Sequence, residues 1–153
     1  MANPDTARAG DTKRLLVVDD DPSVREMLVR VLQGDGYLAW PAADGKQALA
    51  FTASVPTDLV LLDLGLPGKD GWEMFEALRR HNPRLAVIII TARTNQRAIA
   101  EAMGADALFE KPLDCPQLRR TVARILAEPP KPHRAAGPAA TSAARTLWAH
   151  GAR

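Results

Sequence analysis

Acidic residues follow two short apolar segments of the chain, residues 15–18 and 59–62. The first segment runs into Asp19 and Asp20, and the second runs into Asp63. A carboxylate at the end of a buried strand is costly without a partner, so these acids are candidates for binding a cation or attacking an electrophile. Carboxylates that share a cleft repel one another unless a proton or a metal ion compensates them, and such oxygen ligands suit Mg²⁺.

Two further apolar segments lead to side chains that complement a carboxylate. Residues 86–90 are followed by the hydroxyl of Thr91, and residues 107–109 lead to the ammonium of Lys111. The carboxyl ends of parallel strands lie on one edge of a sheet, so we expect all four groups to converge. A carboxylate nucleophile, a divalent metal, an ammonium and a hydroxyl are together the parts needed for phosphoryl transfer to an aspartate.

The apolar segments alternate with segments of helical periodicity, which predicts five strand–helix units. The apolar segments lack polar alternation, as expected for strands covered on both faces. Right-handed crossovers then give a central parallel sheet with helices on both sides, an α/β architecture. The predicted strands are residues 15–18, 38–41, 59–62, 86–90 and 107–109.

Helix starts are marked by acids. Asp21 precedes Pro22 and is predicted to cap the first helix, and Asp44 with Gln47 is predicted to cap the second. Apolar residues at helical spacing are expected to face the core, Met27 of the first helix included. The apolar positions of that helix are Val24, Met27, Leu28, Val31 and Leu32.

Composition indicates one domain with tails. Residues 1–12 are small and polar, residues 13–128 carry the core pattern, and residues 129–153 are rich in Ala, Pro and Arg, so we expect both ends to be disordered. The chain has net charge +2, of which the tail alone supplies +4; the remainder carries about −2, which is no footprint for nucleic acid. The single Cys115 and the shortness of the longest apolar run, residues 85–90, favour a cytoplasmic protein without a membrane segment.

Four motifs together resemble the receiver domain of two-component response regulators. They are Val-Val-Asp-Asp-Asp at 17–21, Leu-Leu-Asp-Leu-Gly-Leu-Pro-Gly at 61–68, Ile-Thr-Ala at 90–92 and Glu-Lys-Pro at 110–112. The resemblance covers about residues 14–127. It implies a doubly wound (βα)₅ three-layer sandwich, similar to flavodoxin, with a five-stranded parallel sheet of order 2-1-3-4-5.

The resemblance also implies roles for the acids. Asp63 would be the phosphoacceptor, and Asp19 and Asp20 would be the acidic pair beside it. Asp20 and Asp63 would bind Mg²⁺ directly and Asp19 mostly through water. The backbone carbonyl of Gly65 would complete the protein ligands of the metal.

The remaining motif residues would act on the phosphoryl group. By resemblance, Thr91 would donate a hydrogen bond to it and Lys111 would pair with its charge. The peptide bond between Lys111 and Pro112 would be cis, as is common in the family.

Three positions depart from the family pattern or are known to vary in it. The position three residues before Lys111, often aromatic in the family and linked to signalling, is Leu108, and Phe109 follows it. Gly65 and Arg93 lie two residues after the acceptor and the hydroxyl, where side chains affect phosphoryl lifetime in the family. We expect Arg93 to face solvent.

These features predict a stand-alone, single-domain response regulator. It would accept a phosphoryl group from a sensor histidine kinase or a histidine phosphotransfer protein and then contact a downstream protein or pass the phosphate on. It would be no enzyme apart from catalysing its own phosphotransfer and dephosphorylation. The alternative is an aspartyl-phosphate hydrolase with Asp19 and Asp21 as nucleophile and acid/base. A flavodoxin-like cofactor site is excluded, because the acids after the first strand would repel a phosphate.

Overall fold

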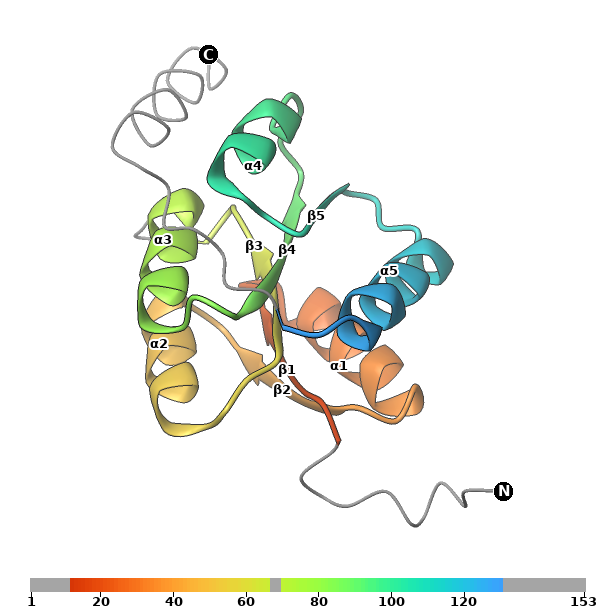
Figure 1. Ribbon diagram of the computed structural model, residues 1–153. Helices are drawn as coiled ribbons and strands as arrows, with labels where there is room; N and C mark the ends of the chain where they lie inside the picture. Colours follow the sequence, from red (N-terminus) through yellow and green to blue (C-terminus); the bar gives the residue numbers. More distant parts are fainter. Residues whose placement is uncertain (1–11, 67–69, 131–153) are drawn as a thin grey trace.

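The computed structural model describes residues 12–66 and 70–130. Five strands alternate with five helices along these residues (Figure 1). The strands are β1 (Arg14–Val18), β2 (Leu38–Ala42), β3 (Leu59–Asp63), β4 (Ala86–Thr91) and β5 (Ala107–Glu110). The helices are α1 (Pro22–Gly34), α2 (Gly45–Ser54), α3 (Gly71–His81), α4 (Arg97–Met103) and α5 (Cys115–Ala127).

The strands form one parallel sheet of order β2-β1-β3-β4-β5, as predicted. Helices α1 and α5 cover one face, and α2, α3 and α4 cover the other (Figure 1). Each crossover returns the chain to the same edge, so all five strands end on one side of the molecule. The three-layer α/β architecture expected from the alternating apolar and helical segments is confirmed.

The core consists of two apolar layers separated by the sheet. Successive residues of β3 alternate between them: Val60 and Leu62 pack beneath α2, α3 and α4, whereas Leu59 and Leu61 pack beneath α1 and α5. All five residues of this central strand are buried. Burial on both faces explains why the sequence of the strand is continuously apolar.

The strands extend slightly beyond the predicted limits. Asp63 pairs with Ile90 in the register of β3 and β4, and Thr91 pairs with Glu110 in that of β4 and β5. Asp63 and Thr91 are therefore the last residues of their strands rather than the first residues of the following loops. Pairing with the neighbouring strands fixes the backbone position of both residues.

The predicted helix caps are confirmed. Asp21 accepts a hydrogen bond from the amide of Ser23 at the start of α1. Asp44 accepts one from the amide of Gln47, whose side chain in turn accepts one from the amide of Ala43. Each side chain satisfies an amide that has no partner within the helix.

The prediction that Met27 lies in the core is wrong, because 37% of this residue is exposed. The buried line along α1 passes through Leu28 and Leu32, one helical turn apart, and Met27 lies about 100° around the helix from Leu28. Its sulfur is instead 3.9 Å from the sulfur of Cys115 on α5. In the described residues, no helix is both long enough and apolar enough to cross a membrane.

Candidate functional site

Three carboxylates meet at the edge where β1 and β3 end. One carboxylate oxygen from each of Asp19, Asp20 and Asp63 lies within 4.8 Å of the other two. The strands are neighbours, with Val18 paired to Leu62, so the residues that follow this pair emerge side by side. Asp19 and Asp63 are buried, whereas Asp20 is exposed. The cluster is thus open to solvent on one side.

Lys111 bridges the two buried acids. Its Nζ lies 3.3 Å from Oδ2 of Asp19 and 3.4 Å from Oδ2 of Asp63. The lysine follows β5, and its backbone amide donates to the carbonyl of Thr91 over 2.8 Å, which fixes where the side chain begins. The peptide bond between Lys111 and Pro112 is cis, as the sequence motif implied.

Backbone amides orient both buried carboxylates. Oδ1 of Asp19 accepts a hydrogen bond of 2.9 Å from the amide of Asp21, and Oδ1 of Asp63 accepts one of 3.0 Å from the amide of Gly65. The other oxygen of each acid faces Lys111. Carboxylate oxygens have lone pairs left over for a further ligand. The amides and the lysine therefore hold the acids in place without exhausting their capacity to bind.

The local charge balance is negative. Burial raises the pKa of the Asp19 carboxyl, as does repulsion from Asp63, while the amide of Asp21 and Lys111 act in the opposite direction. Burial by itself lowers the pKa of Lys111, but the attraction of Asp63 and Asp19 outweighs it, so the pKa is raised and the lysine stays charged. Three carboxylates and one ammonium leave about two negative charges when all are ionised. A divalent cation matches that surplus.

The residues present fit a magnesium ion. Hard oxygen ligands, few in number and partly open to water, are what Mg²⁺ requires, since it keeps several waters and tolerates only one or two protein carboxylates as direct ligands. Asp20 is the exposed member of the three, and Asp63 is buried at the end of the central strand β3. The assignment of the Gly65 carbonyl as a further ligand remains a prediction.

Thr91 is buried at the end of β4, next to the strand that carries Asp63. Its Oγ1 accepts a hydrogen bond of 2.9 Å from the amide of Arg93. A hydroxyl both accepts and donates, so its hydrogen remains available to an acceptor at the site. Arg93 itself is half-buried, in contrast to the expectation that it would face solvent.

Leu108 and Phe109 lie on opposite faces of β5. Leu108 packs against the core beneath α2, α3 and α4, and Phe109 packs against the core beneath α1 and α5. Adjacent strand residues alternate between faces, so the only aromatic residue of β5 points away from α4. The family's aromatic position is therefore filled by an aliphatic side chain on the α4 side.

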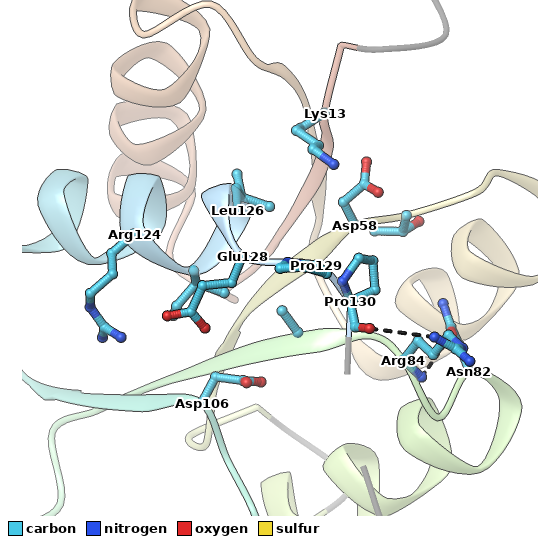
Figure 2. Close-up of a pocket in the computed structure, with 13 residues that line it drawn as sticks. Lys13, Asp58, Asn82, Arg84, Asp106, Arg124, Leu126, Glu128, Pro129 and Pro130 are labelled. Carbon is cyan, nitrogen blue, oxygen red and sulfur yellow. Dashed lines mark hydrogen bonds between the residues drawn. The ribbon is translucent and has the colours of Figure 1, made fainter. Parts of the chain in front are cut away.

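A pocket of about 290 Å³ lies at the opposite edge of the sheet, where the strands begin (Figure 2). Three of its charged residues have partners within the protein. Asp58 accepts from the amide of Arg14 over 2.8 Å, Asp106 accepts from Arg79 and from the amide of Val87, and Arg84 donates to the carbonyl of Pro130 over 3.4 Å. Among the residues that line the pocket, acids and bases balance, and we assign no reaction to it.

The sequence of residues 15–123 matches the family model described as the response regulator receiver domain. The DNA-binding response regulator MtrA of Mycolicibacterium smegmatis is 40% identical over 117 residues, which are 75% of this chain and 50% of MtrA. Sporulation initiation phosphotransferase F of Bacillus subtilis is 36% identical over 116 residues, 74% of this chain and 94% of that protein. The chain thus spans about half of the first relative and nearly all of the second.

Among solved structures, the response regulator TrrA of Thermotoga maritima in complex with Mg²⁺-BeF superposes with a TM-score of 0.69 at 34% sequence identity. The superposition covers 74% of this chain and 99% of TrrA. The match to the family model runs from β1 into α5.

Proposed function

The chain belongs to the response regulator receiver family of two-component signalling, and on that premise we propose that it accepts a phosphoryl group on Asp63. The donor would be a phosphohistidine on a sensor histidine kinase or a histidine phosphotransfer protein. The observation that carries the proposal is the meeting of three carboxylates within 4.8 Å, with Lys111 bridging two of them. Asp63 is the one buried acid of the three that belongs to a strand, as the last residue of the central strand β3, and a backbone amide holds its carboxylate.

The step proposed is an in-line displacement at phosphorus. A carboxylate oxygen of Asp63 forms the new P–O bond as the P–N bond of the phosphohistidine breaks, and the imidazole leaves with the bonding electrons. Lys111 pairs with the negative phosphoryl oxygens, and the Thr91 hydroxyl donates a hydrogen bond to one of them. The amide of Gly65 holds the carboxylate in place during attack.

Mg²⁺, held by Asp20, Asp63, the Gly65 carbonyl and, through water, Asp19, would supply charge compensation for the phosphoryl oxygens. The alternative function, an aspartyl-phosphate hydrolase, requires Asp21 to act as the acid/base. The side chain of Asp21 is instead engaged in capping α1, through the amide of Ser23. We therefore favour the phosphoacceptor.

Residues 13–128 would form the receiver module, and it would signal through protein contacts or pass the phosphate on. The near full-length match to a sporulation phosphotransferase supports a relay role. MtrA is a DNA-binding regulator, but the match covers only half of it, so we propose no nucleic-acid or membrane partner for this module. Pro129 and Pro130, which the sequence placed in the tail, line the pocket at the start of the strands. Residues 131–153 lie outside the described part.

Asp63→Asn and Asp58→Asn provide a matched test, because the two acids stand at opposite ends of the β3 region. Both proteins are incubated with a small phosphodonor and Mg²⁺, and intact mass is measured before and after acid or base treatment. Wild type and Asp58→Asn should gain one labile phosphoryl group, and Asp63→Asn should gain none. Equal labelling of Asp63→Asn would move the acceptor to another residue and contradict the proposal.

A further inference from the structure

A buried hydrogen bond joins the start of α3 to the residue that precedes α4. Nε1 of Trp72 donates to Oε1 of Gln96 over 3.1 Å. Only 5% of Trp72 and 2% of Gln96 are exposed. Trp72 is the second residue of α3, and Gln96 is the residue that precedes α4. The bond therefore links the start of α3 to the loop that follows Thr91.

The tryptophan is fixed relative to the end of β3. Gly71, which precedes Trp72, packs on Leu64, which follows Asp63. A Cβ atom at Gly71 would lie 2.5 Å from the Cα of Leu64, which is too close for any side chain. The amide of Leu64 in turn donates to the carbonyl of Ile90 over 3.1 Å. The start of α3 thus has a single, tightly packed position beside the acceptor strand.

The glutamine is fixed relative to the end of β4. Nε2 of Gln96 donates to the carbonyl of Thr94 over 3.3 Å, and the amide of Arg93 donates to Oγ1 of Thr91 over 2.9 Å. Between them, Asn95 adopts a left-handed conformation with φ of +61°. Residues 92–96, which we name the Thr91 loop, are therefore tied internally as well as to α3.

The side chain of Gln96 bonds to Trp72 and not to the first turn of α4. The residue before a helix commonly supplies a side-chain oxygen to an unpaired amide of the first turn. Gln96 precedes α4 and makes no such bond; its backbone is already helical, and its side-chain oxygen accepts from Trp72. The side chain of Gln96 is therefore committed to a contact between α3 and the segment before α4.

We propose that Trp72 and Gln96 are a positioning pair that holds the Thr91 loop against α3 and thereby sets the Thr91 hydroxyl relative to the Asp63 carboxylate. The inference rests on the proposed function, because Asp63 must be the reacting group. Neither residue would touch the phosphoryl group; each acts through the loop. Loss of either partner leaves a buried polar atom without its hydrogen bond and frees the loop to shift.

The test compares Trp72→Phe, Gln96→Met and the double variant. Beryllium fluoride, a mimic of the phosphoryl group, is titrated by calorimetry at saturating Mg²⁺, and Mg²⁺ is titrated alone. Each single variant should bind beryllium fluoride roughly tenfold more weakly, a coupling typical of linked sites, with unchanged Mg²⁺ affinity. The double variant should bind beryllium fluoride no more weakly than the single variant of lower affinity, because both substitutions delete the same hydrogen bond.

Thr57→Val is the matched control. Thr57 is also buried, and its hydroxyl donates to the carbonyl of Val55 over 2.9 Å at the far end of β3. The Thr57→Val substitution should lower the Tm of the protein without changing its affinity for beryllium fluoride. If Trp72→Phe and Gln96→Met behave in the same way as this control, the pair is merely structural and the inference is overturned. Two independent variants guard against one that fails to fold.

The outcomes also separate the inference from the proposed function. A wild-type protein that binds beryllium fluoride, together with variants of equal affinity, would overturn the positioning pair alone. A wild-type protein that neither binds beryllium fluoride nor gains a phosphoryl group would overturn the proposed function and the pair with it.

Discussion

Both edges of the sheet carry charged groups, but the two edges arrange them differently. At the carboxyl edge, Asp19, Asp20 and Asp63 converge on one point and share Lys111. At the amino edge, three acids and three bases line a pocket and are distributed around it (Figure 2). The first arrangement leaves charge uncompensated, and the second is neutral.

The uncompensated charge at the carboxyl edge supports that edge as the proposed reactive one, although the pocket lies at the amino edge. Asp106, at the amino edge, is consumed by Arg79 and by the amide of Val87, so it stabilises the fold. Among the described residues, Asp63 at the carboxyl edge is hydrogen-bonded to a lysine shared with Asp19 and to one amide. Substitutions should therefore cost stability at the amino edge and ligand binding at the carboxyl edge.

Arg79→Met should have the largest effect, a loss of roughly 3 kcal/mol in the free energy of unfolding, since it breaks a buried ion pair. Arg79 is buried and donates to the carbonyls of Leu85 and Gly104 as well as to Asp106. Urea denaturation measures the loss. Arg80→Met, an exposed neighbour on α3, is the control and should change stability little.

Phosphoryl incorporation in Arg79→Met, measured where the variant is folded, should match wild type. If Arg79→Met had the unfolding free energy of wild type but gained no phosphoryl group, the proposed division of roles between the two edges would be wrong.

Lys111→Ala should weaken binding of beryllium fluoride at saturating Mg²⁺ roughly tenfold or more, because a charged hydrogen-bond donor to the mimic is lost. Mg²⁺ affinity should hold or rise, since a competing cation has gone. Calorimetry measures both. Lys13→Ala removes a lysine from the amino-edge pocket instead and should alter neither. Normal binding in Lys111→Ala would reduce this residue to a structural counter-ion of Asp19 and Asp63.

Asp20→Asn should weaken Mg²⁺ binding by roughly a factor of ten, because a direct charged ligand becomes neutral. Asp21→Asn is the matched control: it removes the adjacent charge, and Asn caps a helix as well as Asp does. Fluorescence of Trp72 or calorimetry reports the titration. Identical Mg²⁺ titration curves for the two variants would mean that Asp20 acts only through its negative charge and is no direct ligand.

Much of this architecture could be predicted from local sequence. Continuous apolar segments gave the strands, and the acids that follow them gave the carboxyl edge, because parallel strands must all end on one side. Asp19, Asp63 and Lys111 lie many residues apart, yet each stands at the end of its own strand or directly after it. Their meeting depends on topology alone, and topology follows from the right-handed crossovers.

What the sequence did not predict depends on contacts between elements. Helical periodicity predicts only whether a residue such as Trp72 is buried, and Gln96 belongs to no motif, so their hydrogen bond could not be predicted. Met27 has the right helical spacing, but the position of α5 decides which side of α1 is covered. The half-burial of Arg93 likewise depends on how the Thr91 loop folds back on its neighbours.

The pocket at the amino edge also marks where the folded chain is entered and left. Lys13, just before β1, and Pro130, after α5, both line it (Figure 2). The domain can therefore be inserted into a loop of a host protein, or circularly permuted by a short linker between these points, without strain on the sheet. Both points lie at the pole opposite the three carboxylates, so a fusion partner joined there would begin on the far side of the sheet from Asp63.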